Sequence, residues 1–136
     1  MSIRLEDLPP ALQEQAKAKI ESQSKYHAKK TAVDGIVFDS VKESKRYAEL
    51  SLLQRAGAIV DLRLQPRYLL QESFKCNGKT IRKIEYVADF QYGYNGKTII
   101  EDVKGMKTPV YLLKKKMFLY KNKDKLETGV WEFKEI

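Results

Sequence analysis

The chain has 136 residues, 43% of them hydrophobic and 32% charged, which is typical of a single folded globular domain. Its net charge of +8 favours nucleic acid or another polyanion as partner. No apolar run could span a bilayer, and the first residues lack the apolar core of a secretory signal. A single cysteine excludes an internal disulfide, so a reducing cytosol is expected. Cys76 with His27 cannot supply the four ligands of a zinc site.

The first 34 residues are predicted to be an N-terminal helical arm and a basic linker ahead of a domain at 35–136. Leu8, Leu12, Ala16 and Ile20 recur at four-residue spacing, which indicates a helix with a thin apolar face. Residues 25–34 are basic and show no periodicity, which predicts a loop.

A second helix is predicted from Val41 to Ala56. Ser40 followed by Glu43 matches a capping box, in which side chains satisfy the free N–H groups of the first turn. Apolar residues then follow at helical spacing, and Gly57 is placed to end the helix.

From residue 59 onward the hydrophobic period changes to two, which predicts strands at 59–64, 67–74, 84–91 and 98–104. The pairs Asn77-Gly78 and Asn95-Gly96 are typical of tight hairpin turns, because both residue types tolerate positive φ. An antiparallel meander is therefore expected.

The last elements are a helix and a strand. Thr108-Pro109 fits the N-cap and first position of a helix that runs to about Lys121. After Gly129, the alternation from Val130 to Ile136 predicts a final strand.

Two carboxylates are placed symmetrically about the second turn. Asp89 lies six residues before Asn95, and Asp102 lies six residues after Gly96, so a two-residue turn would pair them directly. Facing carboxylates repel each other, and a divalent cation such as Mg²⁺ or Mn²⁺ would remove that penalty. The spacing therefore predicts a metal site at Asp89 and Asp102.

Lys104 follows two residues after Asp102, on the same face of a regular strand. It could orient an attacking water or stabilise the charge that develops on a phosphate. Glu101 would point to the opposite face, and the backbone carbonyl of Val103 is a further candidate metal ligand. Taken together, these residues favour an active site over solvent-exposed strand positions.

Tyr86-Val87-Ala88-Asp89-Phe90 followed by Asp102-Val103-Lys104 resembles the motif of the PD-(D/E)XK nuclease superfamily, with Ala88 in the place of the proline. The resemblance implies an α/β fold with the restriction-endonuclease-like αβββαβ core and a mixed, partly antiparallel sheet. It also implies a metal-dependent DNA endonuclease, with Glu43 of the first core helix completing the metal site. Glu43 could equally serve only as the capping partner of Ser40.

Residues 25–136 also resemble a family of small phage and prophage proteins of unknown function with resolvase-like or nuclease-like folds. This resemblance is carried by four stretches, namely Lys25-Tyr26-His27-Ala28-Lys29-Lys30, Phe38-Asp39-Ser40 with Glu43, Leu64-Gln65-Pro66 and Glu101-Asp102-Val103-Lys104-Gly105. It implies a bacterial cytoplasm, a phage or prophage origin and branched or junction DNA as substrate. Gln65 resembles a polar residue near the active site of some resolvases, or it simply ends a strand. A resolvase would be expected to dimerise, with the N-terminal helix as a candidate contact.

Basic side chains around the motif are predicted to contact DNA phosphates, which gives salt-dependent affinity without sequence preference. The predicted set is Lys29, Lys30, Lys42, Arg46, Lys107, Lys114 and Lys115. The run at 114–116 could instead be the solvated face of a helix. The rival function is a non-catalytic DNA-binding or phage assembly protein that keeps a nuclease-like fold. The aromatic residues are read as core rather than base-stacking groups.

Overall fold

The fold is described from a computed structural model of residues 31–33, 35–38, 40–103 and 107–136. The predicted N-terminal helix, Lys29, Lys30 and Lys104 lie outside these residues. The chain divides into two compact units, residues 1–62 and 63–136, and each is described by itself. The boundary predicted after residue 34 stays a prediction. No helix among the described residues is long and apolar enough to cross a membrane.

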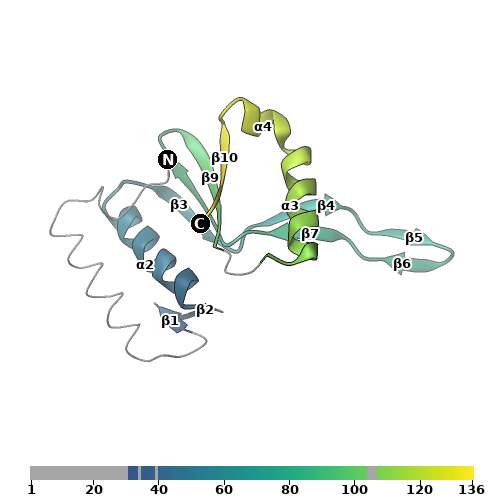
Figure 1. The fold of residues 1–136 in the computed structure, drawn as a ribbon, viewed down its shortest axis with the longest axis horizontal. Helices are drawn as coiled ribbons and strands as arrows, with labels where there is room; N and C mark the ends of the chain where they lie inside the picture. The colour runs from purple at the N-terminus through teal and green to yellow at the C-terminus, as the bar shows by residue number, and fades with distance from the viewer. Residues whose placement is uncertain (1–30, 34, 39, 104–106) are drawn as a thin grey trace. The chain divides into compact units, whose positions relative to one another are not determined.

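The first unit holds a short hairpin and one long helix (Figure 1). Strand β1 (Thr31–Val33) pairs antiparallel with β2 (Ile36–Phe38), so the prediction of a loop was wrong for residues 31–33. Short strands of three residues carry too little alternation to be seen in the sequence. The Phe38 ring lies 5.1 Å from that of Tyr47, on the helix that follows.

That helix, α2 (Val41–Arg55), begins and ends as predicted. The Ser40 side chain accepts a hydrogen bond from the Glu43 N–H at 3.1 Å. At the other end, Gly57 takes φ +78°, its N–H donates to Gln54, and the Ala58 N–H donates to Leu53. These two bonds form a Schellman motif, in which glycine supplies the left-handed residue that ends a helix.

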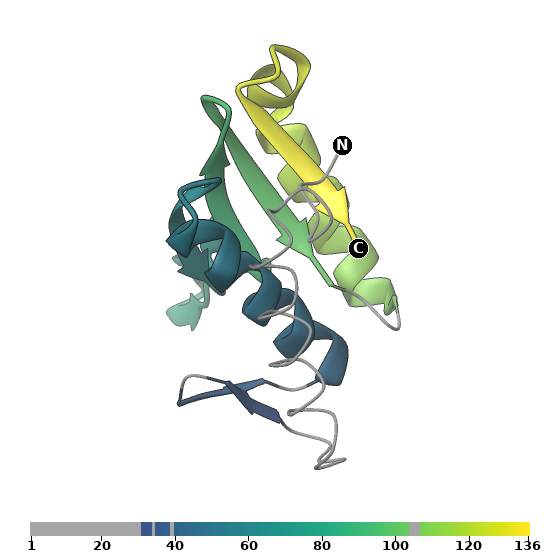
Figure 2. The same ribbon diagram turned by 90° about the vertical axis from the view of Figure 1, so that its left-hand side faces the viewer.

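The main sheet has the strand order β10-β9-β8-β3. Its strands are β3 (Val60–Leu64), which crosses the boundary between the units, β8 (Phe90–Tyr94), β9 (Lys97–Asp102) and β10 (Trp131–Glu135). Strands β8 and β9 are antiparallel, whereas β9 and β10 are parallel and lie side by side (Figure 2). The expected mixed, partly antiparallel sheet is thus present in a mixed α/β fold.

The segment between β3 and β8 forms a long two-stranded ribbon that turns back at Asn77-Gly78, as predicted. The predicted meander is wrong only for β3, which lies beside β8 and not beside the strand that follows it in the chain. Strand β4 (Arg67–Gln71) pairs with β7 (Ile84–Val87), and β5 (Phe74–Cys76) pairs with β6 (Lys79–Ile81). The predicted strands 67–74 and 84–91 are therefore each broken in two. The second break, at residues 88–89, lets the chain leave β4 and pair with β9.

Two helices connect β9 to β10. Helix α3 (Pro109–Lys121) starts at the predicted cap, where the Thr108 side chain accepts from the Tyr111 N–H at 3.1 Å. The short helix α4 (Lys123–Glu127) was not predicted. The core of the second unit is Tyr86, Ala88, Ile100 and Phe118, with Tyr68, Leu70, Tyr111, Leu119, Trp131 and Phe133 packed around it. Tyr86, Trp131 and Phe133 thus belong to the core, as the sequence indicated.

Candidate active site

The turn at Asn95-Gly96 sets the register of the β8–β9 hairpin. Both residues have positive φ, +56° and +76°, as a tight turn of this kind requires. The pairing runs from Tyr94 opposite Lys97 to Phe90 opposite Glu101. The ladder ends there, and the Asp89 N–H donates to the carbonyl of Glu101. The direct pairing of Asp89 with Asp102 therefore stays a prediction.

Asp89 lies at the break between β7 and β8 and is half-buried. Its N–H donates to the Glu101 carbonyl at 3.1 Å, and its carboxylate Oδ2 accepts from the Val103 N–H at 2.6 Å. A carboxylate that accepts a backbone N–H is fixed in orientation. Asp89 therefore fixes the backbone one residue before Lys104.

Gln65 is brought to the same place by the backbone. Its N–H donates to the Asp89 carbonyl at 2.9 Å, and the Ala88 N–H donates to the Pro66 carbonyl at 3.2 Å. Gln65 is exposed and has φ +49°, a conformation that non-glycine residues seldom adopt. The predicted neighbourhood of Gln65 and Asp89 is therefore present.

Asp102 is fully buried, with 0% of its surface exposed. The Tyr86 hydroxyl donates to its Oδ2 atom. Burial raises the pKa of Tyr86, and the hydrogen bond to Asp102 raises it further, so this hydroxyl keeps its proton. Tyr86 thus acts as a fixed donor that holds the Asp102 side chain in place.

Glu135 is a neighbour that the sequence did not reveal. In the parallel pairing of β9 and β10, Glu135 lies opposite Asp102. It accepts from the Tyr111 hydroxyl at 2.9 Å, forms an ion pair with Lys115, and lies 3.6 Å from the Lys107 ammonium. The alternation of the last strand gave its face, but the register between β10 and β9 has no signal in the sequence.

We expect Glu135 to make stability depend on pH. The hydrogen bond from Lys115 lowers the pKa of Glu135. Because this pKa is lower in the folded state, the stability it contributes is present above the ordinary carboxyl pKa of about 4.3 and is lost as pH falls through the lowered value. Glu135→Gln should therefore reduce the unfolding free energy by about 1 kcal/mol at pH 7 and change it little at low pH.

Urea denaturation at pH 7 and at low pH would measure this difference. Glu127→Gln, which removes an exposed acid from α4, is the matched control and should alter stability little at either pH. An equal loss in the Glu135 variant at both pH values would show that the charge of Glu135 does not contribute.

Glu101 points to the opposite face of β9 from Asp102, as its parity predicted. It is fully buried and accepts a hydrogen bond from the Tyr92 hydroxyl. The adjacent buried acids Glu101 and Asp102 thus point to opposite faces of β9. Glu135 of β10 lies on the same face of the sheet as Asp102.

The predicted residues of α2 belong to the first unit. Glu43 is 8% exposed, and its N–H makes the capping bond to Ser40. Arg46 is 5% exposed and paired with Glu49, which corrects its prediction as a surface cation available to phosphate. Lys42 is exposed. A metal ligand role for Glu43 stays a prediction.

The predicted DNA-contacting lysines around α3 differ in their surroundings. The ammonium groups of Lys107 and Lys115 both form ion pairs with the carboxylate of Glu135. Glu135 in turn lies opposite Asp102 in the sheet. Lys107 is 54% exposed along its side chain, whereas Lys115 is 23% exposed. Lys107 is thus the better placed of these two to meet a phosphate, and Lys114 is half-buried.

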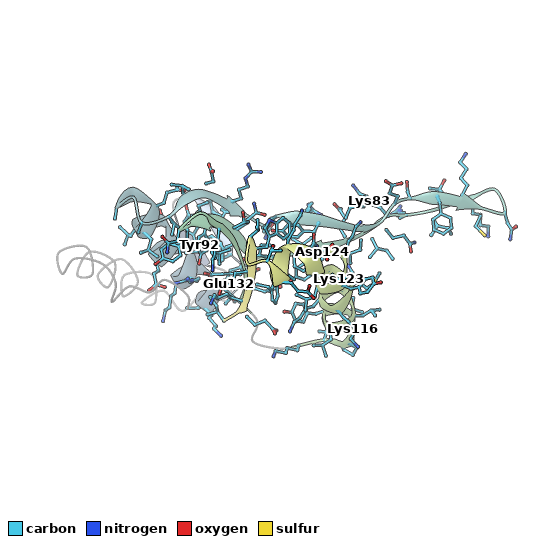
Figure 3. The ribbon with its side chains drawn as sticks, turned by 90° about the horizontal axis from the view of Figure 1, so that it is seen from above. Lys83, Tyr92, Lys116, Lys123, Asp124 and Glu132 are labelled. Carbon is cyan, nitrogen blue, oxygen red and sulfur yellow. The ribbon has the colours of Figure 1, made fainter. Side chains whose placement is uncertain are left out.

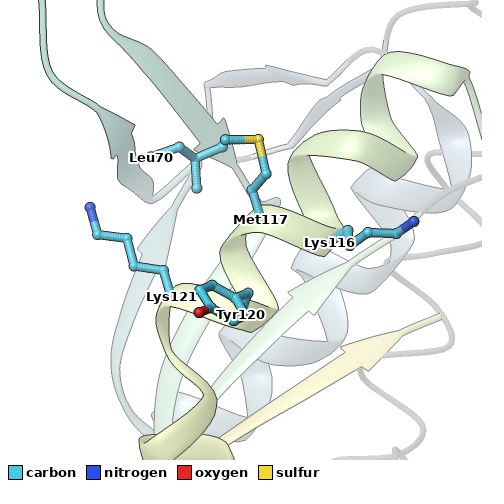
Figure 4. Close-up of a pocket in the computed structure, with 5 residues that line it drawn as sticks. All are labelled: Leu70, Lys116, Met117, Tyr120 and Lys121. Carbon is cyan, nitrogen blue, oxygen red and sulfur yellow. The ribbon is translucent and has the colours of Figure 1, made fainter.

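A pocket lies beside β4, and none of these carboxylates lines it (Figure 4). It is lined by Leu70 and by Lys116, Met117, Tyr120 and Lys121 of α3. This lining contains no carboxylate, imidazole or thiol, so it offers neither a metal ligand nor a general base.

The described residues offer few ligands for a metal ion. Across the described residues, no three Asp, Glu, His or Cys side chains gather as a metal cluster. Asp89 and Asp102 remain the two carboxylates that the sequence predicts as hard oxygen ligands. That number suits Mg²⁺, which commonly takes one or two carboxylates and completes its shell with water and substrate phosphate.

These features define a mixed α/β protein whose sheet carries an acid pair at the end of a hairpin and a further acid on the parallel neighbour strand. Residues 23–135 match the family described as a protein of unknown function (DUF1064). The chain therefore belongs to that family. Comparison with curated proteins and with solved structures gave no match.

Proposed function

We propose that this protein is a metal-dependent endodeoxyribonuclease that hydrolyses phosphodiester bonds at Asp89, Asp102 and Lys104. The observation that carries the proposal is a pair of hydrogen bonds, from the Asp89 N–H to the Glu101 carbonyl and from the Val103 N–H to the Asp89 carboxylate, which hold Asp89 at the end of β9 where Asp102 lies. The element order supports it too, because a helix, antiparallel strands, a helix and a parallel strand follow one another as in the PD-(D/E)XK core.

Each residue has a role that follows from its contacts. Tyr86 holds the Asp102 carboxylate, and Asp89 holds the Val103 N–H. Lys104 then places a cation two residues beyond Asp102, where it would stabilise negative charge on the phosphate. Asp89, Asp102 and the Val103 carbonyl are the proposed ligands of Mg²⁺ or Mn²⁺. When bound, the cation would polarise the phosphate and acidify a water molecule.

DNA is the proposed substrate because the chain carries a net charge of +8 and because its motif resembles that of DNA nucleases. A branched or junction substrate, a homodimer and action in the cytoplasm of a phage-infected or lysogenic bacterium follow from the resemblance to resolvases. The N-terminal helix is kept as the proposed dimer contact.

One observation favours the rival function, a non-catalytic DNA-binding or phage assembly protein. Asp102 is fully buried and hydrogen-bonded to Tyr86, an arrangement that a purely structural acid would also show. A catalytic role requires that the Asp102 carboxylate can still reach a cation at the end of β9, whereas a purely structural role does not require this.

The test is incubation of the protein with labelled four-way junction, flap, single-stranded and plain duplex DNA in Mg²⁺, Mn²⁺ or EDTA. Binding is measured in the same mixtures. We expect cutting that requires the metal and is fastest on one branched substrate. Binding without cutting in either metal would support the rival function.

A further inference from the structure

The ribbon formed by β5 and β6 extends beyond α3 and the core of its unit (Figure 1). Every residue from Gln71 to Lys83 is exposed, on both faces of both strands. An isolated two-stranded hairpin gains little stability, so an exposed ribbon of this length needs another explanation than folding.

The ribbon carries a strong positive charge for its size. Residues 71–83 contain four cations, Lys75, Lys79, Arg82 and Lys83, and one carboxylate, Glu72. Lys83 lies 3.6 Å from Glu85, whereas no ion pair joins the other three cations to a carboxylate within the described residues. Side chains project from both sides of the ribbon, with Lys83 nearer its base (Figure 3).

An apolar pair is exposed on the same ribbon. Phe74 lies directly opposite Ile81 in the β5–β6 pairing, with 48% and 40% of their surfaces exposed. Cys76 opposite Lys79 shares their face, and Lys75 opposite Thr80 lies on the other. The ribbon thus combines cations on both faces with a contact surface that folding leaves uncovered.

We infer that the β5–β6 ribbon is an arm that binds duplex DNA by entering the major groove. A two-stranded ribbon fits that groove, which is about 12 Å wide. Lys75 and Lys79, on opposite faces, would meet the phosphates of the two groove walls, while Phe74 and Ile81 contact base edges such as thymine methyl groups. The choice of DNA as partner rests on the proposed function, but the arm itself needs no catalysis.

The chain supplies a matched control for one of these lysines. The sequence Asn-Gly-Lys-Thr-Ile occurs at 77–81 in the arm and again at 95–99 in the β8–β9 hairpin. Lys79 and Lys97 are therefore both exposed residues that open a strand after the same tight turn. Lys79→Ala and Lys97→Ala make the same change in the same local structure, one on the arm and one off it.

The experiment is fluorescence anisotropy of a labelled DNA duplex in EDTA, so that cleavage is prevented, over a series of salt concentrations. Lys79→Ala should weaken binding and reduce the slope of log K against log salt by about 0.9, and Lys75→Ala with Lys79→Ala by about 1.8. Lys97→Ala should leave the slope unchanged. Phe74→Ser with Ile81→Ser should raise the Kd about fivefold with no change of slope.

Further controls decide among other roles of the arm. Val110→Ser removes an apolar residue that is 62% exposed on α3 and should not alter DNA binding. Double-stranded RNA, whose major groove is too narrow for a ribbon, should bind without any effect of the arm variants. Equal slopes for Lys79→Ala and Lys97→Ala would overturn the inference. A loss of oligomer mass in the Phe74 and Ile81 variant, with DNA binding intact, would instead make the arm a self-association element.

These outcomes are distinct from those of the proposed function. If the arm variants bind DNA more weakly but the wild-type protein never cuts DNA, the arm is supported and the nuclease proposal is refuted. Cutting that is fully retained in the arm variants, with unchanged DNA affinity, would refute the arm and leave the nuclease proposal intact.

Discussion

Asp102→Asn is expected to reduce the rate of DNA cleavage by about 10²-fold or more, and Asp89→Asn to do the same. Each change keeps the shape of the side chain but removes the charge that a cation would bind. Because the two carboxylates are proposed to act on one ion, the double variant should be little worse than either single variant. Single-turnover rates on the substrate that is cut best would measure this.

The control is Asp124→Asn, which removes an exposed acid from α4 and should leave the rate unchanged. Circular dichroism of each variant checks that the fold persists. If the losses of cleavage rate multiply in the double variant, the two acids act separately. An unchanged rate in the Asp102 variant would show that Asp102 is not part of the active site.

Phe118→Ala is expected to lower the free energy of unfolding by about 3–5 kcal/mol. Phe118 is fully buried in the core of the second unit, with its ring 4.8 Å from the rings of both Tyr68 and Tyr86. Since Tyr86 also holds Asp102, the loss of packing should disturb the candidate site as well as the fold. Urea denaturation followed by circular dichroism would measure the change.

Tyr120→Ala is the matched control, because it removes an aromatic ring from the same helix at a position that is 72% exposed. Its contact with Lys123 is a surface cation–π pair, so the expected loss is below about 1 kcal/mol. Similar losses for both variants would show that α3 is stabilised along its length and not through the Phe118 contacts.

The elements with strong local signals were predictable from the sequence. The caps Ser40 and Thr108 determine where α2 and α3 begin, and Asn95-Gly96 determines the register of β8 and β9 from Tyr94 to Phe90. In these cases a few adjacent residues determine the geometry, so no distant contact is needed to predict it.

The features that depend on distant pairing were not predictable. The place of Glu135 opposite Asp102 follows from the parallel register of two strands joined through α3 and α4, and no local residue sets that register. The turn of the ribbon at Asn77-Gly78 was predicted, but its breaks at residues 72–73 and 82–83 were not, because no local residue type marks them. The burial of Arg46 likewise came from packing rather than from charge.

The most direct test of the central claim is conversion of supercoiled plasmid DNA to nicked circles by wild-type protein and by Asp102→Asn, purified in parallel. Each is incubated with Mg²⁺ and with EDTA. We predict nicking by the wild-type protein in Mg²⁺ and in none of the other three mixtures. No nicking by either protein, or equal nicking by both in Mg²⁺, would contradict a metal-dependent nuclease site at Asp102.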